Sequence, residues 1–152
     1  MIRIRETLLP EHVLLGLTAS SRVEAIRQVA GSLRSDTRIS DWQEFLRALR
    51  KCEDVSKVNL HHGLTLPHVR TAAVTKMLMA FGRLTEPVQE KDGPLQFLVI
   101  VGIPRAMDAE YLRLVGTLMR VFRHENLREK LLHAQEAAEI IKIFEKGEKE
   151  TE

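Results

Sequence analysis

The chain has 152 residues, of which 44% are hydrophobic and 5% aromatic, so one domain with a proper core is expected. The 23 basic and 21 acidic residues leave a net charge of only +2, which excludes the basic footprint typical of nucleic-acid binding. Cys52 is the single cysteine, so an internal disulfide is excluded. Neither a signal peptide nor a run of about 20 apolar residues is present, so we expect a cytoplasmic protein with no membrane insertion.

The N-terminal part predicts a strand and then a helix. Residues 13–17 form a short apolar run typical of a strand. Ser21 and Glu24 have the spacing of a capping box, in which a hydroxyl and a carboxylate bond to free amides at a helix start. Apolar residues at helical spacing follow, which predicts an amphipathic helix over 21–34.

A second helix is predicted to begin after Ser40 or Asp41, either of which can cap it. Its buried stripe consists of Trp42, Phe45, Leu46 and Leu49. Residues 53–62 are polar and lack periodicity, which indicates a loop.

Three extended segments follow, at 64–69, 75–84 and 94–103. The last of these is apolar on both faces at 98–101, as in a central strand covered on two sides. Residues 91–94 read Lys-Asp-Gly-Pro, which is a turn signal between the second and third segments.

The C-terminal part returns to helical patterns, with a stripe over 111–122 and two shorter helices over 124–132 and 136–144. We expect a single domain over 1–145 and a charged tail over 146–152. One strand, two helices, three strands and further helices predict the α/β class, as a three-layer α/β/α sandwich around a small mixed sheet.

A histidine that follows directly on a proline is the most distinctive feature of the sequence. Pro67 fixes its own φ and holds Leu66 in an extended conformation, so the His68 imidazole leaves a restricted backbone. Such a frame suits a reactive group that must be presented in one geometry. A histidine that merely caps a strand is the structural alternative.

A metal site is a weaker interpretation of this region. His61 and His62 are adjacent, so on an extended chain they point to opposite faces, and no zinc-binding motif or paired cysteine is present. Cys52 lies at a helix end, where a lone cysteine is usually structural. Since no P-loop or glycine-rich dinucleotide motif exists either, we expect no metal and no cofactor.

A phosphoryl-carrying histidine fits the region better. That chemistry needs a neutral imidazole with one nitrogen held as a donor, so that the other can attack phosphorus, and it needs donors around the phosphoryl oxygens. Arg70 lies two residues after His68, hence on the same face of a continuing strand, and His62 shares that parity. Taken singly, Arg70 is also compatible with a solvated edge charge and His62 with a loop histidine.

The segment 63–68, Gly-Leu-Thr-Leu-Pro-His, resembles the signature of enzyme IIA domains of the phosphotransferase system. The resemblance is to the fructose/mannitol type, which includes the nitrogen-regulatory IIA proteins. It extends from about residue 5 to about residue 144, through the strand and Pro-containing turn at 81–88 and the apolar strand at 95–103.

This resemblance implies that His68 takes a phosphoryl group from the carrier protein HPr. The group would pass to a IIB domain or serve as a signal to a regulated protein, which makes an active domain a phosphohistidine phosphotransferase. No cofactor is needed, because the phosphoryl group arrives on another protein's histidine. The family's α/β/α sandwich with a mixed sheet agrees with the predicted architecture.

Two positions depart from the family pattern. Tyr111 stands where the family usually has a second active-site histidine. A tyrosine can donate a hydrogen bond to a phosphoryl oxygen but cannot become cationic. Cys52 stands where the family usually has an arginine, for which Arg50 or Lys51 would have to substitute.

These departures support a second hypothesis, a divergent IIA-like regulator that binds a partner protein and transfers phosphate slowly or not at all. Tyr111 is then a packing residue on the stripe with Leu114 and Leu118. The sequence contains no IIB, IIC or DNA-binding segment, which favours the regulatory branch, while a single-domain sugar-specific IIA stays open.

Overall fold

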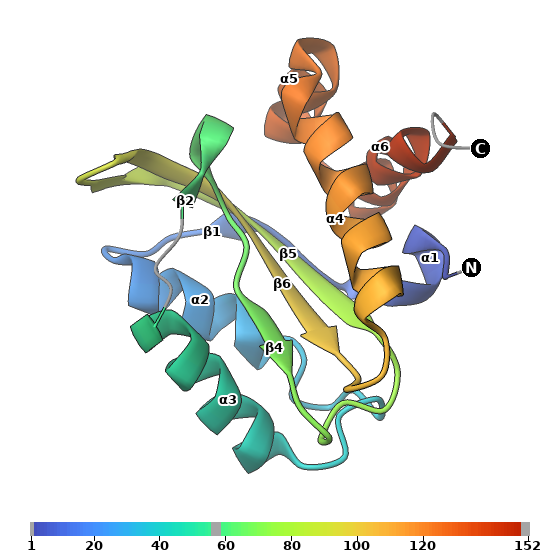
Figure 1. The fold of residues 1–152 in the computed structure, drawn as a ribbon. Coiled ribbons are helices and arrows are strands. Elements are labelled where there is room, and N and C mark those ends of the chain that lie inside the picture. The colour runs from blue at the N-terminus through green and yellow to red at the C-terminus, as the bar shows by residue number, and fades with distance from the viewer. Residues whose placement is uncertain (1, 56–58, 150–152) are drawn as a thin grey trace.

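A mixed sheet separates two layers of helices (Figure 1). The computed structural model describes residues 2–55 and 59–149. The described strands are β1 (Leu8–Leu17), β2 (Asn59–Leu60), β3 (Leu64–Thr65), β4 (His68–Arg70), β5 (Leu78–Glu90) and β6 (Gly93–Ile103). The described helices are α1 (Ile4–Thr7), α2 (Arg22–Gly31), α3 (Trp42–Val55), α4 (Asp108–Arg123), α5 (Glu125–His133) and α6 (Ala137–Lys149), with a 3₁₀ turn, η1 (His61–Gly63).

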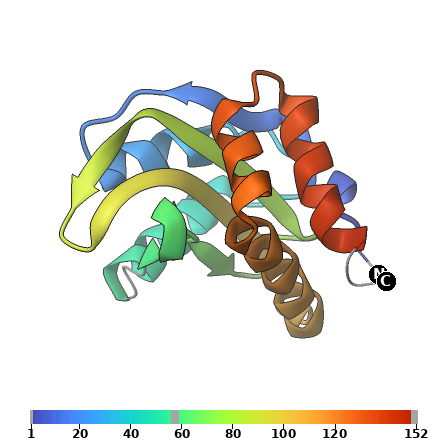
Figure 2. The same cartoon turned by 90° about the horizontal axis from the view of Figure 1, so that it is seen from above.

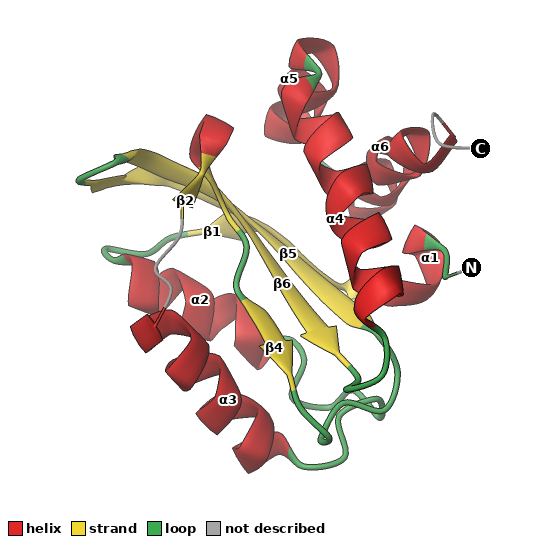
Figure 3. Ribbon diagram, viewed as in Figure 1, coloured by secondary structure: helices red, strands yellow, loops and turns green. Residues whose placement is uncertain are grey.

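The strand order is β1-β5-β6-β3-β2, and β4 pairs with β6 beyond the end of β3. The hairpin β5–β6 is antiparallel, while β1 is parallel to β5, and β3 and β4 are parallel to β6. Helices α2 and α3 cover one face, and α1, α4 and α6 cover the other (Figure 3). The predicted three-layer sandwich with a mixed sheet is therefore confirmed, and Figure 2 shows the layers from above.

The central strands are buried on both faces, as their sequence predicts. In β5, Met79 and Phe81 belong to the apolar cluster under α4 and α6. Leu78 and Ala80 alternate with them and belong to the cluster under α2 and α3. Every residue from Leu95 to Ile103 except Gln96 is buried, so β6 has the continuous apolar pattern of a covered central strand.

Helices α2 and α3 are capped by the predicted residues, although Glu24 in the cap of α2 bonds to a different residue than predicted. The Ser21 hydroxyl accepts from the Glu24 N–H at 3.2 Å, but the Glu24 carboxylate accepts from Ser20 rather than from the Ser21 N–H. Asp41 caps α3, since its Oδ1 accepts from the Glu44 N–H at 3.1 Å. Each cap satisfies an amide that has no partner within its own helix.

Strand β1 is longer than the apolar run 13–17 predicts, because it begins at Leu8. Its register with β5 shifts between the pairs Leu8–Met79 and Val13–Phe81, as in a β-bulge. The bulge contains a proline, a glutamate and the buried His12, which break the alternation of apolar residues. A pattern of alternating hydrophobicity therefore detects only the second half of the strand.

The segment predicted as a loop over 53–62 contains three different structures. Helix α3 continues to Val55, residues 56–58 lie outside the described residues, and β2 and η1 follow. In η1, His62 has a φ of 67° and Gly63 a φ of 73°, both in the left-handed region. This turn interrupts the extended chain just before β3.

Helix α6 continues past residue 145, where the sequence predicts a charged tail. Glu148 accepts a hydrogen bond from the Ile4 N–H at 2.8 Å, and Gly147 packs so closely on Thr117 that a Cβ would lie 2.9 Å from its carbonyl oxygen. These contacts extend the helix to Lys149, and the remainder of the predicted tail, 150–152, lies outside the described residues.

Candidate functional site

Strand β4 and the first turn of α4 bring His68, Arg70 and Tyr111 to one end of the sheet. His68 pairs with Val101, and Arg70 pairs with Ile103 at the end of β6. Because β4 and β6 are parallel, the chain leaving β6 starts α4 beside the end of β4. The two segments are far apart in the sequence and adjacent in space (Figure 1).

The backbone around His68 is held from both sides, as the Pro-His sequence predicts. The Val101 N–H donates to the Pro67 carbonyl at 3.0 Å, which fixes the proline against β6. The His68 ring is half-buried, and its Nδ1 lies 3.4 Å from the Leu66 carbonyl oxygen. That oxygen can only accept, so the contact favours the tautomer with hydrogen on Nδ1 and leaves the lone pair of Nε2 free.

Tyr111 packs directly against the His68 imidazole. The two ring centroids lie 5.5 Å apart with an interplanar angle of 31°. Burial raises the pKa of the Tyr111 phenol, although the positive charge of Arg70 acts in the opposite direction. The phenol therefore remains a neutral hydrogen-bond donor at neutral pH.

Arg70 forms an ion pair with Asp108, the first residue of α4. Arg70 Nη2 lies 2.7 Å from Asp108 Oδ1, and the two side chains are 43% and 68% exposed. Arg70 follows His68 with the alternation of a strand, since Val69 between them is buried. The expectation that Arg70 shares a face with His68 is therefore met, whereas no sequence pattern pointed to its carboxylate partner.

Cys52 also lies in this neighbourhood, close enough to act electrostatically on the Tyr111 phenol and raise the pKa of that group. Its thiol is half-buried near the end of α3. The position where the family usually carries an arginine thus holds a smaller side chain that cannot become a cation. Arg70 on β4 brings a guanidinium to the same end of the sheet.

His62 lies apart from His68. It precedes β3, whose Leu64 pairs with Phe97, four residues before the β6 partner of His68. Four strand residues span about 13 Å. His62 and His61 instead line a cleft of about 650 Å³ with Arg128, and burial together with the charge of Arg128 lowers the pKa of His62.

A buried arginine that no sequence pattern predicted supports the strand that leads into the site. Arg22, at the start of α2, donates from Nη2 to the Thr65 hydroxyl at 2.5 Å. Its guanidinium also lies 3.3 Å from Glu53 and 3.4 Å from Glu90. This contact joins α2 to β3, two residues before Pro67.

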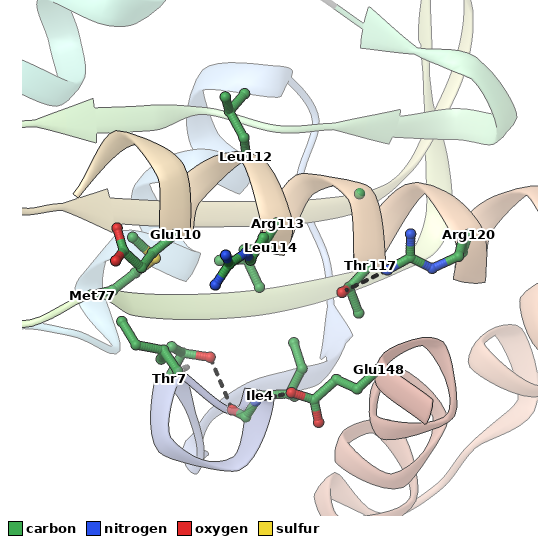
Figure 4. Close-up of a pocket in the computed structure, with 12 residues that line it drawn as sticks. Ile4, Thr7, Met77, Glu110, Leu112, Arg113, Leu114, Thr117, Arg120 and Glu148 are labelled. Atoms are coloured by element: carbon green, nitrogen blue, oxygen red, sulfur yellow. Dashed lines mark hydrogen bonds between the residues drawn. The ribbon is translucent and has the colours of Figure 1, made fainter. Parts of the chain in front are cut away.

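A cleft of about 710 Å³ lies between α1, α4 and α6 and does not include His68 (Figure 4). Several of its polar groups make structural bonds, such as the Glu148–Ile4 bond and the contact of Arg120 with the Thr117 hydroxyl at 3.0 Å. Within 2–55 and 59–149, no group of three or more His, Cys, Asp and Glu side chains could hold a metal ion. No helix in those ranges is long and apolar enough to cross a bilayer.

Relatives of known name and structure resemble this chain. A fructose-specific EIIA component from Haloferax volcanii is 33% identical over 101 residues, covering 64% of this chain and 66% of the relative. A nitrogen regulatory protein from Bradyrhizobium diazoefficiens is 22% identical over 93% of this chain and 94% of its own length. A fructose-specific EIIABC component from Bacillus subtilis is matched over only 24% of its length, so the chain spans about two thirds of one relative and about a quarter of another.

Solved structures of IIA proteins also resemble this chain. The nitrogen regulatory protein IIA-Ntr from Neisseria meningitidis superposes with a TM-score of 0.83 at 26% identity, covering 93% of this chain and 98% of that one. The IIA mannitol structure from Escherichia coli, at 21% identity and a TM-score of 0.73, shares the fold. The family described as phosphoenolpyruvate-dependent sugar phosphotransferase system, EIIA 2, matches residues 6–147. This chain therefore belongs to that family, whose role is to accept phosphoryl groups or to regulate within the phosphotransferase system.

Proposed function

We propose that His68 accepts a phosphoryl group on Nε2 from an HPr-like phosphocarrier protein. The group then passes to a IIB domain or serves as a signal to a regulated protein. The observation that supports this proposal is the setting of the His68 imidazole. Its Nδ1 lies against the Leu66 carbonyl, and its half-exposed ring packs on Tyr111, with Arg70 two residues along the same strand. We also propose a cytoplasmic location.

The transfer step balances without a base or a metal. The lone pair of His68 Nε2 attacks phosphorus, and the P–N bond of the donor's protonated phosphohistidine breaks. The electron pair of that bond returns to the donor imidazole, which leaves as a neutral ring. His68 keeps its hydrogen on Nδ1, donated to the Leu66 carbonyl, and becomes the protonated phosphohistidine.

Three groups around His68 support the developing negative charge. The guanidinium of Arg70 can donate to phosphoryl oxygens, and such charge-assisted bonds are about twice as strong as neutral ones. Tyr111 adds a neutral donor. The first turn of α4, where no side chain caps the helix, adds the positive end of its dipole.

The proposed partner proteins are inferred from relatives of this chain. A complex of enzyme IIA mannitol with phosphorylated enzyme IIB mannitol from Escherichia coli shares this fold, at a TM-score of 0.74 and 20% identity. A IIB domain is therefore one candidate acceptor for this chain, and a regulated protein, as the similarity to nitrogen regulatory proteins suggests, is the other.

The test is incubation with phosphoenolpyruvate, enzyme I and HPr, read out by intact mass. We expect one phosphoryl group in an acid-labile linkage, lost in His68→Ala and retained in the control His133→Ala, which removes an exposed histidine outside the site. Labelling that survives in His68→Ala would assign the phosphoryl group to another residue.

A regulator that does not transfer phosphate is the second candidate, and Tyr111 and Cys52 favour it, because neither side chain supplies a cation. It predicts no labelling of the wild-type protein in an assay where a competent IIA domain is labelled. The same incubation therefore separates the two functions.

A further inference from the structure

The only carboxylate that pairs with Arg70 in the described part of the chain belongs to Asp108, in the first turn of α4. This turn lies directly beside His68, since Tyr111 in the same turn packs on the imidazole. A negative charge at this place opposes the arrival of a phosphoryl group, which itself carries a charge of about −1.5 to −2. The pairing therefore needs a role that is compatible with phosphoryl acceptance.

We propose that Asp108 is a competing anion: it holds Arg70 while His68 is unmodified and gives Arg70 up to the phosphoryl group once His68 carries one. This inference rests on the proposed function of His68 and concerns its regulation. It makes Asp108 a positioning residue that acts through Arg70 and does not touch the transferred group.

Because the pair is exposed, breaking it costs little free energy. With the two side chains 43% and 68% exposed, solvent screens their attraction, and an exposed pair is easily broken. A phosphoryl group offers Arg70 a higher charge and more acceptor oxygens than a carboxylate does. The exchange therefore favours the phosphoryl group.

Arg70 can serve both partners without a change of backbone. Its Cα lies about 6.6 Å from that of His68, two residues along the same strand and on the same face. Its charge already acts on the Tyr111 phenol, whose ring contacts His68. A rotation of the arginine side chain is enough to move the guanidinium from Asp108 to a group on His68.

The exchange frees Asp108 when His68 is phosphorylated. The surface beside His68 then changes in two respects: it gains a phosphoryl group paired with Arg70, and it gains an unpaired carboxylate at the start of α4. A partner protein that contacts both His68 and Asp108 can thereby distinguish the two forms of the domain by charge pattern.

The test is the partition of phosphoryl groups between HPr and this protein at equilibrium, measured by intact mass. Asp108→Asn removes the competitor. We therefore expect the ratio of phosphorylated to unphosphorylated protein, at a fixed ratio for HPr, to rise about threefold. Glu110→Gln is the matched control, because it removes the same charge from the same helix turn at a residue that lines the cleft with Met77 (Figure 4). We expect no shift from it, and equal shifts in the two variants would overturn the exchange.

A double-mutant cycle isolates the role of Arg70. The effect of Asp108→Asn should disappear in the Arg70→Gln background, and an effect that persists there would show that Asp108 does not act through Arg70.

Phosphoramidate, which phosphorylates histidine without a protein donor, separates this inference from the choice of donor. In protein labelled in this way, we expect Arg70→Gln to lower the second acid dissociation constant of the phosphoryl group about threefold, measured by ³¹P NMR titration. An unchanged titration would contradict the exchange even if HPr proved not to be the donor, whereas a His68 that phosphoramidate cannot label would overturn both proposals.

Discussion

Two arginine–aspartate pairs of nearly equal length lie beside two histidines of this chain, and burial separates their roles. Arg38 Nη2 lies 2.6 Å from Asp36 Oδ2, with side chains 11% and 4% exposed. The corresponding distance from Arg70 to Asp108 is 2.7 Å, with side chains 43% and 68% exposed. Contact distance alone does not distinguish a permanent structural bond from one that a ligand can replace.

The buried pair is part of a larger hydrogen-bond network. Arg38 also donates from Nη1 to three backbone carbonyls, those of Glu6, Thr7 and Met77. His12 Nε2 lies 2.8 Å from Asp36 Oδ2, and the guanidinium of Arg38 holds the pKa of the Asp36 carboxyl well below its usual range. This network ties the β1 bulge to the segment between α2 and α3. In contrast, the exposed pair lies largely in solvent, and the helix turn that supplies Asp108 also packs Tyr111 against His68.

The largest effect that tests this comparison is on stability. We expect Asp36→Asn to lower the free energy of unfolding by about 3 kcal/mol, because it leaves the buried charge of Arg38 without its partner. Asp108→Asn removes the same charge from the exposed pair and should cost less than about 1 kcal/mol. Chemical denaturation of both variants measures the difference, and equal losses would remove the distinction between the pairs.

The buried pair also predicts a dependence on pH. Since the pKa of Asp36 is lowered in the folded state, its ionisation stabilises the fold above the ordinary aspartate pKa of about 3.9, and this stabilisation is lost as the pH falls through the lower folded value. The gap between wild type and Asp36→Asn should therefore narrow below about pH 4. A gap that stays constant down to acid unfolding would show that the Asp36 charge is not what stabilises the network.

A smaller effect is expected at the exposed site and concerns rate. Tyr111→Phe keeps the ring against His68 but removes the donor, so phosphoryl transfer from HPr should slow about tenfold. Tyr111→His supplies a group that can become cationic and should transfer faster than wild type. Single-turnover transfer measures both, and wild-type rates in folded variants would leave Tyr111 with a packing role alone.

The smallest effect is expected at His62, which lies with Arg128 in the other cleft. His62→Ala should change the rate of phosphoryl transfer by no more than about twofold. The same single-turnover assay serves here. A tenfold loss in a folded variant would mean that His62 reaches the phosphoryl group after all.

The sequence predicted the fold well where one periodicity continues without interruption. The apolar run at 98–101 gave the central strand, and the stripe from Tyr111 to Phe122 gave α4. It failed where tertiary contacts decide the structure. The bulge at His12 hides half of β1, and the Arg38 network that surrounds it joins residues more than 30 positions apart.

The site was predictable in its centre and not at its edges. The dipeptide Pro67-His68 carries a local constraint that the sequence itself shows, and alternation along β4 correctly placed Arg70 on the same face as His68. Alternation does not extend to His62, because the left-handed turn at His62 and Gly63 breaks the extended chain before β3. Asp108 reaches Arg70 only because α4 starts beside the end of β4, which is a consequence of topology.

The most direct test is to observe which imidazole nitrogen carries the phosphoryl group, by ¹H–¹⁵N correlation NMR of phosphorylated protein labelled in its histidines. The contact of Nδ1 with the Leu66 carbonyl predicts a single phosphorylated ring, that of His68, modified at Nε2 with its hydrogen on Nδ1. A phosphoryl group on Nδ1, or on the ring of any other histidine, would contradict the account.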